Sequence, residues 1–169
     1  MEYSTTNKYG YFGGICGRSD GANGIIISCI SIGNVNVAAN GINTKGAVGG
    51  ICGKTTEQNY SIANYAIGTL STGDYIDSYI GGVTGMDRPH SFQIESNYWL
   101  EGQGAVKRFG NITNTGDSDI IGRKTSTEMQ NAADGLNQAI NAWNQANSGS
   151  ICEYEFYDVP GAYPKLRKK

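Results

Sequence analysis

The chain has 169 residues and a mass of 18.0 kDa, a length that suits one domain with a buried core. Only 17% of its residues are charged, while 25 are glycine and 11 are tyrosine, which is typical of extracellular β-structure rather than of disordered segments. The net charge of -2 gives no electrostatic basis for binding nucleic acid, and no segment approaches the ~18 apolar residues that span a bilayer, so we expect neither partner.

A glycine motif occurs three times along the first hundred residues. Its copies are Gly13-Gly14-Ile15-Cys16-Gly17, Gly49-Gly50-Ile51-Cys52-Gly53 and Gly81-Gly82-Val83-Thr84-Gly85. A second block follows each copy, 14 or 15 residues after its first glycine: Ser28-Cys29-Ile30, Ala63-Asn64-Tyr65 and Ser96-Asn97-Tyr98-Trp99. This spacing predicts that the whole unit is a structural repeat, with periods of 36 and then 32 residues.

Each repeat contains two segments with the character of short strands. One is centred on the glycine motif, as in 47–52, and the other is richer in β-branched residues, as in 25–32. The residues between them are glycine, asparagine, aspartate and serine, which favour turns. We predict a mainly β fold in which residues 1–122 form a parallel β-solenoid. Three repeats also allow a threefold β-prism or trefoil, with the motifs arranged around an axis.

The four cysteines allow two interpretations. Cys16 and Cys52 occupy equivalent positions, and stacked repeats would bring them to about 4.8 Å, within the range of a disulfide. A cysteine between aliphatic and glycine residues is more often a buried free thiol, which is the interpretation that we favour. Cys29 lies where the later repeats have asparagine, and Cys152 has no obvious partner. None of the four cysteines has the CxxC spacing or the neighbouring histidine of a zinc site, and we predict no metal and no cofactor.

The pattern changes after residue 100. The polar segment 101–119 is predicted to be a long loop. Thr125 and Glu128 have the spacing of a capping box, and apolar residues at helical spacing follow them: Met129, Ala133, Leu136, Ile140 and Trp143. We therefore predict a helix over 126–146, a final strand over 151–157 and a turn through 160–164. Residues 123–169 would form a C-terminal cap of the same domain that covers the open edge of the stack.

Aromatic residues in the second and third repeats are the candidate ligand-binding side chains. An exposed strip of rings could stack on sugars or peptides. Its candidate members are Tyr60, Tyr75, Tyr79 and Trp99. The competing interpretation, which we favour, is an internal ladder with one residue per repeat that fills the core: Ile30, Tyr65 and Tyr98.

Signals of catalysis are weak, and we predict no catalytic residue. Gly53-Lys54-Thr55 ends like a phosphate-binding loop, but position 48 holds valine where that pattern needs glycine, and no helix is predicted behind it. His90 lies in a turn beside Asp87 and Ser91, where adjacent residues rarely form a catalytic triad. The acids occupy non-equivalent positions of the repeats, and a calcium site at 117–119 would lack any calcium-loop motif.

The glycine motifs and the blocks that follow them resemble the GLUG-type repeats of bacterial cell-surface proteins, found in adhesin-like proteins and in surface peptidases of the immunoglobulin A protease type. The segments 127–129 and 161–166 are similar to the usual ending of such arrays. Two departures are a second glycine where the family has leucine, and Thr84 where the other copies have cysteine. The resemblance implies an extracellular repeat-built β-fold that serves as a stalk or binding module.

We therefore predict a non-enzymatic extracellular repeat module, with a role in adhesion or as a spacer and with surface glycans or proteins as partners. The chain opens within a repeat, so we expect it to be part of a longer protein whose export signal lies upstream. The first alternative is a carbohydrate-binding module that uses exposed tyrosine and tryptophan. The second alternative is a polysaccharide-acting β-helix enzyme with paired carboxylates.

Overall fold

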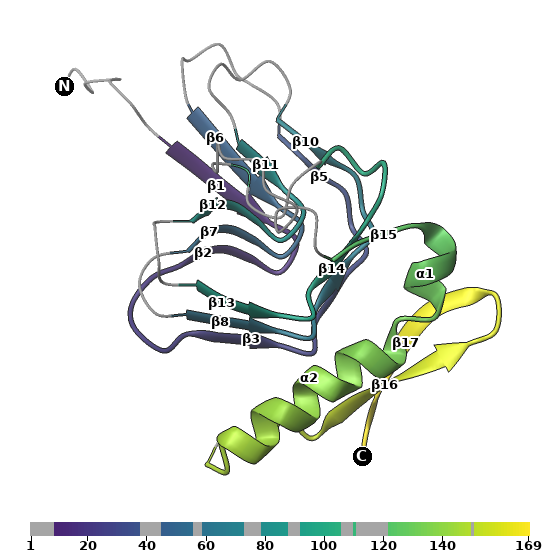
Figure 1. Cartoon of the computed structure of the whole chain (residues 1–169). Helices are drawn as coiled ribbons and strands as arrows, with labels where there is room; N and C mark the ends of the chain where they lie inside the picture. The colour runs from purple at the N-terminus through teal and green to yellow at the C-terminus, as the bar shows by residue number, and fades with distance from the viewer. Residues whose placement is uncertain are drawn as a thin grey trace, which may run out of the picture.

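The computed structural model describes residues 9–37, 45–55, 59–72, 79–87, 92–105, 110, 122–149 and 151–169. In this part of the chain the protein is mainly β. The three repeats form parallel sheets, and the C-terminal region adds two helices and an antiparallel strand pair along one side of them (Figure 1). The predicted mainly β fold with a C-terminal helix is thus confirmed.

Equivalent strands of the three repeats pair side by side in parallel. One sheet holds the strands that lead into the glycine motifs: β1 (Tyr9–Gly13), β6 (Lys45–Gly49) and β11 (Tyr79–Gly81). A second holds the strands that leave the motifs: β2 (Cys16–Ser19), β7 (Cys52–Thr55) and β12 (Thr84–Asp87). A third follows the turns: β3 (Ile25–Ile27), β8 (Asn59–Ile62) and β13 (Phe92–Glu95).

Two further sheets complete each repeat. One has four strands: β4 (Ile30–Ser31), β9 (Tyr65–Ala66), β14 (Tyr98–Leu100) and β15 (Arg123–Lys124). The other pairs β5 (Val35–Asn36) with β10 (Leu70–Ser71). Because β15 pairs with β14, the sheet of the repeats extends two residues beyond the predicted boundary at residue 122.

The glycines of the motif allow the neighbouring backbones to approach closely. Gly13, Gly49 and Gly81 are register partners in adjacent strands. A Cβ on Gly81 would collide with the carbonyl oxygen of Thr84 and would lie 2.7 Å from the amide nitrogen of Gly110. A larger residue therefore could not keep the close approach at this position.

Two buried asparagines form a ladder at the bend where the second block of each repeat begins. The residue at the bend has a positive φ in all three repeats: Ser28 (54°), Ala63 (52°) and Ser96 (48°). The next residue in the later repeats is asparagine. Asn64 Oδ1 accepts from the Cys29 amide at 2.7 Å, and Asn64 Nδ2 donates to Asn97 Oδ1 at 2.9 Å. The ladder thus pairs polar groups that the bend would otherwise leave buried and unsatisfied.

The segment after β14 stays beside the third repeat at the points that the structure describes. The Leu70 amide donates to the Gln103 carbonyl at 2.6 Å, the Gly110 amide to the Thr84 carbonyl at 3.0 Å, and the Trp99 amide to the Gly122 carbonyl at 3.0 Å. Residues 106–109 and 111–121, which include most of the predicted loop, lie outside the described residues.

Two hydrophobic cores hold the molecule together. The first lies between the sheets of the repeats: Val48, Ile51, Ala66, Leu70, Val83, Trp99 and Ala105. The second joins the outer faces of β8 and β9 to the C-terminal region: Ile62, Ala63, Tyr65, Met129, Ala132, Ala133, Leu136, Ala139, Ile140, Trp143, Cys152 and Phe156. This second core therefore packs the C-terminal region against the repeats.

The C-terminal cap differs from the prediction in its position. We expected it to cover the open edge of the stack, but α2 contacts β8 and α1 contacts β14 and β15, so it lies along the side of the repeats (Figure 1). The C-terminal region packs there because Ile62 and Tyr65 make the outer face of the repeats apolar, and this face would otherwise be exposed to water.

The predicted helix over 126–146 is interrupted once. It forms as α1 (Ser126–Gln130) and α2 (Ala133–Ala146). The capping box of Thr125 and Glu128 is confirmed, and so is the burial of all five apolar residues at helical spacing. At the break, Asn131 Nδ2 donates to the Thr127 carbonyl at 2.8 Å, a local bond that competes with continuation of the helix.

The final strand is displaced from its prediction and has a partner that we did not predict. Instead of one strand over 151–157, the structure has β16 (Tyr154–Val159) paired antiparallel with β17 (Ala162–Lys168). The turn contains only 160–161, where Gly161 has φ 72°. Pro164 suggested a longer turn, but it lies at an irregularity in the register, where the strand needs no amide donor.

Candidate functional site

The candidate Trp99 is buried in the interior of the repeats. It is fully covered there by the first core, so it offers no surface for stacking, and its prediction as a ligand-binding residue was wrong. The cause is strand alternation, because Tyr98 and Trp99 point to opposite faces of β14. The sequence shows that both rings lie on one strand, but it does not show which face of the strand points into the repeats and which face the C-terminal region covers.

The predicted ladder exists but fills a different core. Tyr65 is the register partner of both Ile30 and Tyr98, as expected. The ladder faces outward and is covered by the C-terminal region, not enclosed within the repeats. Tyr65 donates its hydroxyl to the Pro164 carbonyl, and its ring centroid lies 5.9 Å from that of Phe156. Burial raises the pKa of Tyr65 to about 12, with a smaller contribution from a neighbouring tyrosine.

Of the other two candidates, one lies within the described residues. Tyr79 is half-buried on β11, beside Ala47 in the register. Tyr75 lies outside the described residues. The three described candidates do not form one exposed strip, because Trp99 is buried.

Tyr60 contributes to a pocket of about 430 Å³ between the repeats and α2. Its ring lies edge-on to Trp143, with centroids 5.1 Å apart and an interplanar angle of 61°. The remaining described lining residues are Ile62, Glu95, Ala142, Ala146 and Asn147. The sequence analysis selected Tyr60 but not Trp143 or Glu95. Trp143 was assigned only to the core. Glu95 was missed because nothing in the sequence shows that the helix lies close to β13.

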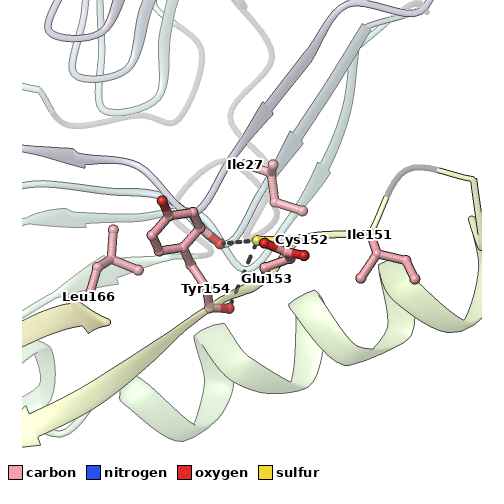
Figure 2. Close-up of a pocket in the computed structure, with 7 residues that line it drawn as sticks. Ile27, Ile151, Cys152, Glu153, Tyr154 and Leu166 are labelled. Atoms are coloured by element: carbon pink, nitrogen blue, oxygen red, sulfur yellow. Dashed lines mark hydrogen bonds between the residues drawn. The ribbon is translucent and has the colours of Figure 1, made fainter. Parts of the chain in front are cut away.

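A second cavity, of about 480 Å³, lies where β3 meets the segment before β16 (Figure 2). Its walls are mostly apolar: Ile27, Ile151, Tyr154 and Leu166, with Ser28, Cys152 and Glu153 completing the lining. The Cys152 sulfur lies 3.1 Å from Ser28 Oγ and 3.9 Å from the Tyr154 carbonyl oxygen, as the dashed lines show. Such a cavity can accept an apolar group, and its thiol is already hydrogen-bonded.

All four cysteines are free, which for Cys16 and Cys52 is the interpretation that we favoured, although only Cys52 of the two is buried. Cys16 and Cys52 are register partners in β2 and β7, and each donates its thiol hydrogen to a carbonyl two residues ahead. Burial, reinforced by the Cys16 thiol, raises the pKa of Cys52 to about 12. Burial and the nearby Cys152 also raise the pKa of Cys29. These two groups are therefore protonated at neutral pH, and a thiol in that form is a poor nucleophile.

The segment that resembles a phosphate-binding loop is part of a strand. Gly53, Lys54 and Thr55 lie in β7, and the next described residues form the strand β8. The described part of the chain therefore places no helix N-terminus behind them to hold a phosphate. Lys54 is only 4% exposed. Its ammonium donates to Tyr11 Oη at 3.2 Å and lies 4.6 Å from the centre of the Tyr11 ring. Lys54 thus packs against an aromatic side chain of the neighbouring repeat.

The remaining sequence candidates are only partly described. Asp87 ends β12, whereas His90, Ser91 and the acids at 117–119 lie outside the described residues. Within the described ranges, no group of three or more histidine, cysteine and acidic residues is arranged to hold a metal ion. No helix in that part of the chain is long and apolar enough to cross a membrane.

The chain was compared with known proteins at the level of family, sequence and structure. No family model matches it, and neither a curated protein nor a solved structure does.

Proposed function

We propose that the chain is a parallel β-solenoid module of a bacterial surface protein, with an extracellular role as a spacer or in adhesion. One observation carries the proposal. Equivalent strands of successive repeats pair in parallel, with equivalent residues as partners, as in Cys16 with Cys52 and Cys52 with Thr84. A threefold prism or trefoil has less support, because it would distribute equivalent strands around an axis instead of pairing them.

The chemistry of the described residues supports a structural role. Several buried polar side chains inside the repeats bond to one another, as in the ladder of Asn64 and Asn97. The partly buried thiol of Cys29 and the buried thiol of Cys52 have raised pKa values, which does not favour nucleophilic catalysis. The resemblance of the glycine motifs to GLUG-type repeats supports the location at a bacterial surface.

A disulfide-trapping experiment tests the solenoid. Asn36 and Ser71 are register partners near the surface, and cysteines at both positions should form a disulfide in a variant without the four native cysteines. Cysteines at Asn34 and Ser71 are two residues out of register and should stay reduced. Mass spectrometry under non-reducing conditions reads both outcomes. A threefold arrangement would leave both pairs unlinked, which would contradict the proposed architecture.

A display experiment tests the role. The chain is placed between a membrane anchor and an unrelated binding domain on bacterial cells, in one or several copies. A spacer should increase the capture of bead-bound ligand as copies are added, and an adhesive module should by itself retain cells on a glycan- or protein-coated surface. If capture does not depend on copy number and the chain alone retains no cells, the proposed role is wrong.

A further inference from the structure

We propose that the pocket between β8, β13 and α2 binds an organic cation, an ammonium or guanidinium group on a small apolar carrier. Its described lining combines two aromatic rings, a carboxylate and the end of a helix. This inference does not depend on the architecture or on the role proposed above.

The charge of the pocket is negative. Glu95 is exposed and is the one charged group among the described lining residues. Its position on β13 follows from the register, in which it is the partner of Ile62 on β8. Its carboxylate forms no hydrogen bond or ion pair with any described residue. An exposed carboxylate without a protein cation attracts a positive ligand.

The aromatic rings add a second attraction for the same charge. Tyr60 and Trp143 both line the pocket, and the electron-rich faces of such rings attract cations within about 6 Å. The Tyr60 hydroxyl has no hydrogen-bond partner among the described residues. Tyr60 is half-buried while Trp143 is almost fully buried, so the tyrosine is the ring that a ligand reaches first.

The C-terminal end of α2 also attracts positive charge to the pocket. The helix ends at Ala146, is capped by Asn147 and has no basic residue in its last turn. The exposed carbonyl groups of a helix C-terminus carry partial negative charge, which a cation normally compensates. Asn147 Nδ2 donates to the Trp143 carbonyl at 3.0 Å, so the amide oxygen of Asn147 is the part of that side chain left to accept a bond.

The balance of donors and acceptors selects the ligand. The described lining offers two kinds of acceptor, the Glu95 carboxylate and the Asn147 amide oxygen, whereas its donors are the Tyr60 hydroxyl, which also accepts, and the second hydrogen of the Asn147 amide. A neutral sugar needs both donors and a flat exposed ring face, whereas here the two rings meet edge-on at 61°. A protonated amine or guanidinium group, which only donates, matches the described lining better. The carrier must fit about 430 Å³.

Nuclear magnetic resonance provides a test with an internal control. The two tryptophans give two indole N–H signals, one from Trp143 in the pocket and one from Trp99 in the interior. The probes are butylammonium, ethylguanidinium and glucosamine, compared with the neutral butanol and N-acetylglucosamine. The cations should shift the Trp143 signal in a saturable manner with millimolar dissociation constants and leave Trp99 unchanged. The neutral compounds should have no effect.

Two matched variants complete the test. Glu95→Gln should weaken binding of the cationic probes about tenfold, because it removes the charge but keeps the shape. Glu101→Gln makes the same change on an exposed residue outside the pocket and should bind like the original chain. Tighter binding of glucosamine than of butylammonium would identify amino sugars as the ligand class. The opposite order would identify aliphatic amines and guanidinium groups, as in basic side chains. Equal binding of neutral probes, or full affinity in Glu95→Gln, overturns the proposal.

Discussion

At the level of single residues, several contacts within and beside the repeats allow only one residue type. Only glycine fits at Gly81, because the neighbouring backbone leaves no room for a Cβ. The asparagine at Asn64 is required because its side chain bonds to four partners around the bend. Tyr65 has a similar role in the outer core, where its hydroxyl reaches the Pro164 carbonyl. Substitutions at Gly81 and Tyr65 test these contacts through the stability of the protein.

Gly81→Ala should lower the free energy of unfolding by at least about 2 kcal/mol, because a methyl group there meets backbone atoms that have no room to move. Gly33→Ala is the control, since a Cβ at Gly33 would have no atom within 4 Å. The control should change stability by no more than about 0.5 kcal/mol in urea titrations. Equal stability of the two variants would show that the close approach at Gly81 is not essential.

The stability of the protein should fall at alkaline pH. The pKa of Tyr65 is raised from 10 to about 12 in the folded state, so the neutral phenol is favoured by folding. Its contribution is fully present below pH 10 and is lost as the pH rises towards 12. The pKa of Cys52 is raised from 9 to about 12 in the folded state, so this thiol also loses its stabilising contribution as the pH rises, over a wider pH range that begins near 9.

Urea midpoints measured from pH 8 to pH 12 check this expectation. In Tyr65→Phe the urea midpoint should fall less steeply with pH above pH 10, because the variant lacks the titrating hydroxyl. The variant also loses the bond to Pro164 and should be less stable at pH 8. An unchanged slope in Tyr65→Phe would rule out this tyrosine as a source of the alkaline loss.

At the level of elements, local rules decide where each helix and strand begins. The capping box starts α1 at Ser126, Asn131 separates it from α2, and the 160–161 turn sets the register of the final strand pair. These signals act over three or four residues, so they work before any tertiary contact forms.

Thr125→Ala should cost about 1 kcal/mol, because the Glu128 amide loses its side-chain acceptor at the helix start. Thr127→Ala is the matched control, since Thr127 is exposed within the same helix and its hydroxyl caps nothing. Thermal unfolding followed by circular dichroism compares the two variants. A cost as large in Thr127→Ala would mean that the cap itself contributes little.

At the level of the whole molecule, two cores share one set of sheets. Ala66 and Trp99 face the interior, and their neighbours Tyr65 and Tyr98 face the C-terminal region. The same strands therefore hold both cores, and loss of one exposes the apolar side of the other. This arrangement favours a single cooperative unit.

The two tryptophan indole signals should accordingly disappear together in a urea titration. Trp99 reports on the interior of the repeats and Trp143 on the outer core. Their midpoints should agree, because Ile62, Ala63 and Tyr65 of the repeats form part of the core that contains Trp143. If the Trp143 signal were lost at a clearly lower concentration, the C-terminal region would be an independent unit.

The amino-acid sequence by itself determined the repeat, the pairing of Ile30 with Tyr65, the capping box and the buried face of the helix, because each depends on spacing along the chain. Only the tertiary structure decided the face that Trp99 occupies and the side against which the helices pack. Both faces of β9 and β14 are apolar and both are covered, so the alternation that normally marks an inner face is absent. The Tyr60 pocket likewise exists only because α2 lies against β8.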